Sequence, residues 1–326
     1  MARDIPHTRA IRHEGHEEGM NPIQEQASAP TGWLVTGAGG MLGQDVLAVL
    51  AAEGEQAVAL DRAALDLTDP AAVQAALERH RPAVVVNCAA WTAVDDAETR
   101  EDEALAINGD GPAHLAAACA RTGAVLLQVS TDYVFAGDAT TPYAEDAPTA
   151  PRSAYGRTKL AGEQAVLKTL PERGYVVRTA WLYGAGGPNF VRTMIKLEGV
   201  KDTLDVVDDQ RGQPTWSADL AGLLLALGRG ALAGTAPAGI YHGTSSGETT
   251  WYGFTREIFS LLGTDPDRVR PTTSAAFTRP APRPAYSVLG HDRFAEAGIE
   301  PLRDWRAALT EAFPEIHRVQ TKENTA

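Results

Sequence analysis

Between residues 32 and 183, short apolar runs alternate with longer segments of mixed polarity, a pattern that indicates strands alternating with helices. Five runs are predicted to be buried strands: Trp33–Val35, Ala57–Leu60, Ala83–Val86, Val125–Val129 and Tyr175–Arg178. Continuously apolar strands that alternate with helices are typical of a parallel sheet covered on both faces. The pattern therefore predicts an α/β fold with a doubly wound parallel sheet.

The segments between these runs carry helix signals. Asp69 followed by Pro70 predicts a helix start, with the aspartate as N-cap and the proline at the first helical position. A long helical region is expected over about residues 95–121, with an interruption near residues 108–112, which read Asn-Gly-Asp-Gly-Pro.

The regular alternation ends after Gly184. Helices are expected at residues 217–230 and 251–263, and residues 279–284 are rich in proline. This change predicts a smaller C-terminal lobe, and we expect the chain to return to the sheet before it ends.

Composition narrows the functional classes. The chain has 326 residues, 44% of them hydrophobic, which is enough for a large core, and its formal net charge is −13. It has no Lys/Arg-rich run and no apolar stretch of about 20 residues, so neither nucleic acid nor a membrane is an expected partner. Cys88 and Cys119 are the only cysteines and are expected to be small buried residues, which fits a cytoplasmic protein.

Three glycines follow the first predicted strand with the spacing Gly-x-x-Gly-x-x-Gly: Gly37, Gly40 and Gly43. The first permits a tight turn, the second lets the backbone approach a pyrophosphate, and the third lets the next helix pack on the strand. Asp61 closes the second predicted strand at the offset expected for a residue that binds the adenine ribose. We therefore predict a Rossmann-like domain that binds a dinucleotide.

The residue pair at the end of the second strand leaves the choice between NADH and NADPH open. Asp61 can accept hydrogen bonds from ribose hydroxyls, which favours NADH, whereas Arg62 can pair with a 2′-phosphate, which favours NADPH. The alternative role for Arg62 is an exposed loop charge. The prediction is therefore NADPH or NADH.

Further cofactor contacts are expected along the strand ends. Asp66 and Leu67 follow a short loop and are placed beside the adenine. Ala89 and Ala90 end the third strand with small side chains, as needed where a cofactor lies against the sheet.

Tyr155 and Lys159 are four residues apart, so a helix places both on one face. A nearby ammonium favours the phenolate and is expected to lower the pKa of Tyr155, which would donate a proton to a carbonyl oxygen. Lys159 would also hold the nicotinamide ribose, and the Thr131 hydroxyl would hydrogen-bond the same carbonyl oxygen. With the glycine turn, these residues predict a short-chain dehydrogenase or reductase.

These expectations divide the chain into four parts. Residues 1–30 are polar and lack apolar periodicity, which predicts a disordered leader. Residues 31–184 form the expected NAD(P)-binding domain, residues 185–315 the mainly substrate-binding lobe, and residues 316–326 a tail.

Seven sequence blocks together resemble the dTDP-4-dehydrorhamnose reductase family. The blocks are Asn87–Glu98, Val129–Phe135, Tyr155–Glu163, Arg178–Tyr183, Asn189–Val191, Asp209–Thr215 and Gly239–His242. The resemblance implies an extended short-chain reductase that reduces the C4 ketone of a dTDP-linked 4-keto-6-deoxy sugar, most directly dTDP-4-dehydro-L-rhamnose to dTDP-L-rhamnose.

The resemblance also implies site residues. At the cofactor it places Gly40, Met41, Leu42, Ala90, Trp91, Thr92 and Val129, together with Tyr155 and Lys159. Near the sugar it places Thr131, Asp132 and Tyr155, with Val94, Tyr133 and Trp181 lining the pocket. Arg211 and Gln213 either reach the nucleotide or stabilise their loop, and His242 is expected to be structural.

Two other functions stay open at this point. The same chemistry could act on a related antibiotic deoxysugar, such as a dihydrostreptose precursor. A non-catalytic regulatory subunit of the methionine adenosyltransferase type also resembles this family, but it would need no Thr131, Tyr155 and Lys159. No metal site is predicted, because the glutamates that bind magnesium in some family members have no match here. A homodimer is left open.

Overall fold

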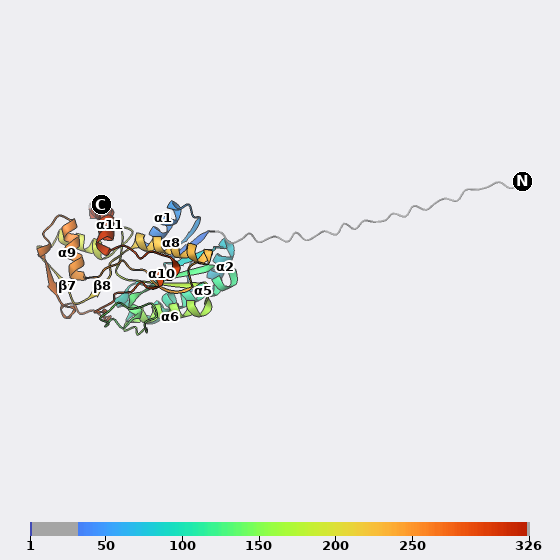
Figure 1. Ribbon diagram of the computed structural model, residues 1–326, viewed down its shortest axis with the longest axis horizontal. Coiled ribbons are helices and arrows are strands. Elements are labelled where there is room, and N and C mark those ends of the chain that lie inside the picture. The colour runs from blue at the N-terminus through green and yellow to red at the C-terminus, as the bar shows by residue number, and fades with distance from the viewer. Residues whose placement is uncertain (2–31, 325–326) are drawn as a thin grey trace.

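The computed structural model describes Met1 and residues 32–324 (Figure 1). The predicted leader lies, apart from Met1, outside the described residues. A six-stranded sheet with the order β10-β5-β4-β3-β1-β2 forms the centre, and every pairing in it is parallel. Its strands are β1 (Trp33–Thr36), β2 (Ala57–Leu60), β3 (Val84–Asn87), β4 (Val125–Thr131), β5 (Gly174–Thr179) and β10 (Gly239–His242). The predicted doubly wound α/β fold is confirmed.

Helices cover both faces of this sheet (Figure 1). On one face lie α1 (Met41–Ala52) and α8 (Ser217–Ala233), and on the other lie α2 (Pro70–His80), α5 (Gly111–Thr122) and α6 (Ala154–Thr169). Successive residues of β1 point to opposite faces, so Trp33 and Val35 pack with α1 and α8 while Leu34 packs with α2 and α5. Both faces are therefore buried, which explains why the strands read as continuous apolar runs.

The long helical region predicted after β3 is divided in the structure. It consists of α3 (Val94–Ala97), α4 (Glu101–Leu105), a π-helical turn η1 (Ala106–Asp110) and α5. The interruption was expected, but it is a widened helical turn and not a break. A π-turn places one extra residue in the helix, and such turns often present a side chain at a functional site.

The chain returns to the sheet at β10, where Ile240 pairs with Val176 of β5. Beyond the carboxyl ends of the strands, a second core forms around Phe254 and Trp305. It is built by α7 (Phe190–Glu198), α9 (Trp251–Leu261) and α11 (Trp305–Asn324), and flanked by β7 (Leu204–Val207) and β12 (Val269–Thr272).

The remaining elements are short. They are β6 (Leu182–Tyr183), β8 (Arg211–Gly212), β9 (Thr215–Trp216), β11 (Thr249–Thr250), η2 (Asp132–Val134), η3 (Pro266–Arg268), η4 (Ser274–Ala276) and α10 (Arg293–Ala297). The expected boundary at residue 316 falls inside α11, whose Ile316 is buried, because this residue packs in the second core. Within residues 32–324, no helix is long and apolar enough to cross a membrane.

Candidate functional site

The glycine turn between β1 and α1 is closely packed. Gly37 has φ +65°, and a Cβ there would lie 2.5 Å from the Ala89 amide nitrogen, at the end of β3. A Cβ on Gly43 would lie 2.3 Å from the Gly37 carbonyl oxygen. Gly40 is the N-cap of α1 and carries no capping side chain, so the first-turn amides are not satisfied by a cap. These features fit the pyrophosphate of a dinucleotide at the helix N-terminus, and Met41 and Leu42 form the first positions of that helix.

The end of β2 presents the two residues that were expected to read the adenine ribose. Asp61 and Arg62 are both exposed, and Asp61 Oδ1 accepts hydrogen bonds from the backbone of Ala63 and Ala64 at 3.0 and 2.9 Å. These bonds orient the carboxylate at the edge of the sheet next to the glycine turn. Asp61 lies beside the glycine turn, since a Cβ on Gly39 would lie 3.8 Å from the Asp61 Cβ.

Asp66 and Leu67, the next two residues predicted to lie beside the adenine, differ in their exposure to solvent. Asp66 Oδ1 accepts hydrogen bonds from Thr68, which hold the pKa of the Asp66 carboxyl below its usual range. The Leu67 side chain is buried in the core beneath the sheet, and its carbonyl bonds His114 Nδ1 at 2.8 Å. Asp66 is exposed to solvent, whereas the Leu67 side chain has little exposed surface that a cofactor could contact.

A chain of buried hydrogen bonds crosses the carboxyl ends of three strands. Thr36 Oγ1 donates to Asn87 Oδ1 at 2.6 Å, and Asn87 Nδ2 donates to Gln128 Oε1 at 2.7 Å. Gln128 Nε2 then donates to the Val129 carbonyl at 2.8 Å, and Lys159 Nζ donates to the same carbonyl at 2.7 Å. The sheet is thereby joined to α6 by side chains, because a polar residue on each of these neighbouring strands satisfies the next.

Asn108, in the π-turn, holds the segment that follows β3. Its Oδ1 accepts from the Trp91 amide at 2.9 Å, its Nδ2 donates to the Trp91 carbonyl at 3.1 Å, and Nδ2 also bonds Thr158 Oγ1 on α6 at 3.2 Å. The segment with Ala90 and Thr92 is therefore tied to the same helix that carries Tyr155. Sequence reasoning noticed Asn108 only as part of the expected interruption of the helical region; the polar residue within a helical run was the available signal.

Tyr155 and Lys159 lie on α6, whose N-cap Ser153 accepts from the Gly156 amide at 3.1 Å. Lys159 is 4% exposed, and burial lowers its pKa to about 8. Desolvation raises the pKa of the Tyr155 phenol, against a lowering contribution from a hydrogen bond with the Thr131 hydroxyl. The expected lowering of the Tyr155 pKa by Lys159 is therefore wrong for this arrangement, because the cost of desolvating a phenolate is the largest contribution.

Thr131, Asp132 and Tyr133 meet Tyr155 at the carboxyl end of β4. Thr131 Oγ1 donates to Asp132 Oδ1 at 2.9 Å and accepts from the Tyr133 amide at 3.2 Å. The Tyr133 ring stands edge-on to the Tyr155 ring, with centroids 5.5 Å apart. Burial raises the pKa of Asp132 to about 6. The predicted residues of two segments, Thr131–Tyr133 and the start of α6, thus form one cluster.

Trp181 follows the end of β5 and adopts φ +45°, a left-handed conformation that is uncommon for a bulky side chain. Its indole stacks on Trp251 of α9, and a Cβ on Gly212 would lie 2.6 Å from the Trp181 ring. Trp181 is therefore clamped between the sheet end and the second core. Gln213, next to Gly212, is buried and bonds the backbone of Leu289, which makes it a loop-stabilising residue.

His242 is also structural in its contacts, since its Nδ1 bonds the Gly290 carbonyl at 2.9 Å and burial lowers its pKa to about 3. Arg211 forms an exposed ion pair with Glu248, with 3.0 Å between Nη1 and Oε1.

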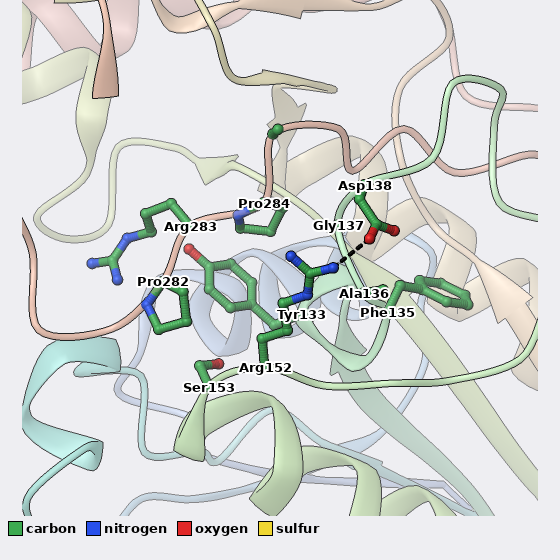
Figure 2. A pocket seen from close by; sticks show the side chains of 11 residues that line it. Tyr133, Phe135, Ala136, Gly137, Asp138, Arg152, Ser153, Pro282, Arg283 and Pro284 are labelled. Atoms are coloured by element: carbon green, nitrogen blue, oxygen red, sulfur yellow. Dashed lines mark hydrogen bonds and ion pairs between the residues drawn. The ribbon is translucent and has the colours of Figure 1, made fainter. Parts of the chain in front are cut away.

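A cavity of about 120 Å³ adjoins Tyr133, and Figure 2 shows Arg152 pointing toward Asp138 on one side and the segment Pro282–Pro284 on the other. Arg283 in that segment pairs with Asp95 of α3, with 2.9 Å between Nη2 and Oδ2, and the Ala281 amide bonds the same carboxylate at 3.2 Å. The proline-rich segment thereby reaches the residue next to Val94. Sequence reasoning missed Asp95 and Arg283, although an arginine between two prolines was visible.

Comparison with known proteins agrees with this geometry. The family model described as "RmlD substrate binding domain" matches residues 32–318. A dTDP-4-dehydrorhamnose reductase from Streptomyces griseus is 64% identical over 284 residues, covering 87% of this chain and 93% of that protein. A probable dTDP-4,6-dihydroxy-2-methyloxan-3-one 4-ketoreductase from Streptomyces antibioticus is 59% identical, covering 87% and 95%.

Solved structures show the same relationship. The dTDP-4-dehydrorhamnose reductase from Bacillus anthracis in complex with NADP superposes with a TM-score of 0.83 at 37% identity, covering 88% of this chain and 99% of that one. The predicted resemblance is confirmed by the family match and by these relatives: the chain belongs to the RmlD substrate-binding-domain family of dTDP-4-dehydrorhamnose reductases.

Proposed function

We propose that this protein uses NADPH or NADH to reduce the C4 ketone of a dTDP-linked 4-keto-6-deoxy sugar, most directly dTDP-4-dehydro-L-rhamnose to dTDP-L-rhamnose. The observation that carries the proposal is the meeting of Thr131, Tyr155 and Lys159 at the strand ends beside the glycine turn. The 64% identical reductase and the NADP complex of the 37% identical one support the same activity.

The chain's own residues fit a dinucleotide along the strand ends. The turn from Gly37 to Gly43 would hold the pyrophosphate, Asp61 and Arg62 the adenine ribose, and Lys159 the nicotinamide ribose. When bound, the reduced cofactor supplies the hydride for the carbonyl carbon. The segment from Ala89 to Thr92 and the Val129 carbonyl would form the floor of the site.

The substrate would lie over the cluster at the end of β4. Tyr155 would donate its proton to the C4 oxygen, and burial keeps that proton in place because it raises the pKa of the phenol. Asp132, Tyr133, Val94 and Trp181 would contact the sugar. We assign these roles on the clustering of Thr131, Asp132 and Tyr133 around Tyr155 and on the family relationship.

A second candidate is the reduction of a related antibiotic deoxysugar by the same residues. The 59% identity to a probable 4-ketoreductase from Streptomyces antibioticus supports this second candidate. The two activities differ in which sugar is accepted and in the C4 configuration of the product, and the same reacting groups serve both.

The test is an assay of the purified chain with NADPH or NADH and dTDP-4-dehydro-L-rhamnose, followed at 340 nm, with NMR of the product. We expect cofactor oxidation and dTDP-L-rhamnose. Tyr155→Phe should fold and bind cofactor but lose about 10²–10⁴ in kcat, the range expected for a positioned general acid. Turnover only with another dTDP-4-keto sugar would select the second candidate, and no turnover with any of them would favour a regulatory subunit.

The proposal also includes a cytoplasmic location and a homodimeric assembly. Cys88 and Cys119 are both free, which supports a reducing compartment such as the cytoplasm. We also propose a homodimer, to be tested by light scattering of the purified chain; a monomer mass at micromolar concentration would exclude it.

A further inference from the structure

We propose that Gln128 is a positioning residue for Lys159: through the Val129 carbonyl it holds the Lys159 ammonium in the orientation that binds the nicotinamide ribose. The inference rests on the proposed function, since it concerns the lysine that would hold the cofactor there. It gives a buried glutamine a role that is exerted through another side chain.

Gln128 is a polar residue in the middle of an otherwise apolar part of the sheet. It is 1% exposed and lies on β4, in register with Asn87 of β3 and Val176 of β5. Its side chain is on the face covered by α2, α5 and α6, where Val176 packs. A buried amide destabilises the fold unless its polar atoms are hydrogen-bonded, so the use of each atom of Gln128 matters.

A backbone amide fixes the direction of the hydrogen bonds around Gln128. The Ala89 amide can only donate, and it donates to Asn87 Oδ1 at 3.1 Å, as does Thr36 Oγ1 at 2.6 Å. Asn87 Nδ2 is then the atom turned toward β4, where it donates to Gln128 Oε1 at 2.7 Å. Gln128 therefore presents its Nε2 to the Val129 carbonyl, at 2.8 Å.

The Val129 carbonyl is the point where this chain of bonds meets Lys159. Lys159 Nζ donates to the same oxygen at 2.7 Å, and the two lone pairs of a carbonyl can accept both donors. Within residues 32–324 this is the one hydrogen bond of Lys159 Nζ. Two of the three ammonium hydrogens are therefore left for a ligand, and the third sets the direction in which they point.

The neighbouring acidic groups do not take over this anchoring role. Glu163, one turn further along α6, has both carboxylate oxygens bonded to Arg178, at 2.7–3.2 Å. The Cys88 thiol keeps its proton because burial raises its pKa to about 12. The Val129 carbonyl is therefore the anchor of Lys159, and Gln128 is the side chain that holds this anchor.

The same chain of bonds connects two parts of the cofactor site. It begins at Thr36, which directly precedes Gly37 of the glycine turn, and it ends at Lys159. The lysine is thereby fixed relative to the turn by side-chain bonds across β1, β3 and β4. A dinucleotide that reaches from the turn to the lysine would meet a preorganised site, which lowers the cost of binding.

The test compares two fragments of the cofactor that differ by one ribose. ADP-ribose carries the ribose to which nicotinamide is joined in the cofactor, and ADP lacks it. The ratio of their Kd values therefore measures the contact with that ribose. We expect the wild type to bind ADP-ribose about 10–100-fold more tightly than ADP, the range for hydrogen bonds to a charged group. Isothermal titration calorimetry of the full chain gives both constants without turnover.

Gln128→Met keeps the length of the side chain but has no hydrogen for the Val129 carbonyl. It should lower the preference for ADP-ribose at least about threefold, while the affinity for ADP stays within about twofold of the wild type. Lys159→Met should abolish the preference. Adding Gln128→Met to Lys159→Met should then change the ratio by less than about twofold, because Gln128 acts through Lys159.

Val176→Ala is the matched control. Val176 is as buried as Gln128 and in register with it, but it lies outside the chain of hydrogen bonds. Its cavity should lower stability and leave the ratio of the two Kd values unchanged.

If Gln128→Met does not fold, Gln128→Glu decides the question, because it keeps the shape of the side chain. The nearby Lys159 ammonium favours the ionised form of the new carboxyl, which has no hydrogen for the Val129 carbonyl and draws the ammonium away from it. The preference for ADP-ribose should fall in this variant too.

The proposal is overturned if folded Gln128→Met, or Gln128→Glu in its place, keeps the wild-type ratio. It is also overturned if the Gln128 substitution has the same effect with and without Lys159, or if the wild type binds ADP-ribose no better than ADP. Failure of the proposed function would look different: the chain would show the expected ratios but reduce no dTDP-4-keto sugar.

Discussion

Trp181 and Trp251 stack face to face, with 3.5 Å between ring centroids and 8° between ring planes. Trp251 is held in turn by Gln210, whose Oε1 accepts from the indole nitrogen at 3.1 Å. The contact joins the end of β5 to α9, two segments that lie 70 residues apart in the chain. It holds Trp181 at φ +45°, a conformation that costs about 1–3 kcal/mol and persists only because surrounding contacts offset this cost.

Gly212→Ala should disturb this clamp. The added Cβ would lie 2.6–2.8 Å from three atoms of the Trp181 indole, so the ring or the backbone has to move. We expect a loss of about 1–3 kcal/mol in the free energy of unfolding and a raised KM for the sugar nucleotide, measured by urea denaturation and steady-state kinetics.

The matched control is Gly222→Ala in α8. A Cβ at this position meets nothing within 4 Å, and alanine favours a helix interior by about 0.5–1 kcal/mol over glycine. This variant should be as stable as the wild type or more so. If Gly212→Ala and Gly222→Ala changed stability and KM equally, the packing of Trp181 would not require glycine at position 212.

Glu163→Gln should destabilise the protein strongly. Glu163 and Arg178 form a buried ion pair with 2.7 Å between Oε2 and Nη2 and side-chain exposures of 1% and 2%. Removing one partner leaves a buried charge uncompensated, which costs about 3–5 kcal/mol. Glu163 also raises the pKa of Lys159, so the variant should shift that pKa further down.

Chemical denaturation of Glu163→Gln and Glu101→Gln provides the comparison. Glu101 pairs with Arg157 at 2.7 Å, but the two side chains are 40% and 45% exposed, so its loss should cost at most about 1 kcal/mol. A cost for Glu163→Gln no greater than that for Glu101→Gln would contradict the importance of the buried pair.

His242 should make stability depend on pH in mildly acidic solution. Burial and the nearby Arg178 lower its pKa to about 3, below the value of about 6.5 in an unfolded chain. The unfolded state therefore binds the proton first, and the stability due to the neutral histidine is lost as the pH falls from about 6.5 toward 3. The expected slope is up to about 1.4 kcal/mol per pH unit.

His242→Gln removes this titration, so its free energy of unfolding should fall less between pH 7 and pH 5 than that of the wild type. The exposed His317→Gln should behave like the wild type. Urea denaturation at several pH values measures both. Parallel pH profiles for wild type and His242→Gln would show that another group carries the dependence.

Arg62→Ala should shift cofactor choice toward NADH. Asp61 repels a 2′-phosphate while Arg62 attracts it, and both side chains are exposed, so screening weakens both effects. We expect the wild type to accept both cofactors, with kcat/KM values within about two orders of magnitude, roughly 2.7 kcal/mol. Steady-state kinetics with NADH and NADPH measures the ratio.

An unchanged ratio in Arg62→Ala would show that this residue does not read the phosphate. A wild-type preference above about a thousandfold in either direction would defeat the dual use of cofactors.

Most of the sheet could be predicted because its signals are local. A continuously apolar strand needs only a few consecutive residues to be recognised, and the glycine turn is defined by spacing over seven residues. The helical spacing of Tyr155 and Lys159 is likewise a property of one turn. The boundary drawn at residue 316 missed the end of α11, because Ile316 packs against residues far away in the chain.

The sequence by itself determined the fold class, and it predicted the cofactor turn and the reacting side chains, since each depends on short-range periodicity or spacing. Only the tertiary structure decided which partner each of these side chains has. Lys159 bonds the Val129 carbonyl 30 residues away, and desolvation raises the Tyr155 pKa where sequence reasoning predicted a lowering. Burial and long-range contacts set these energies, and both arise only when the chain is folded.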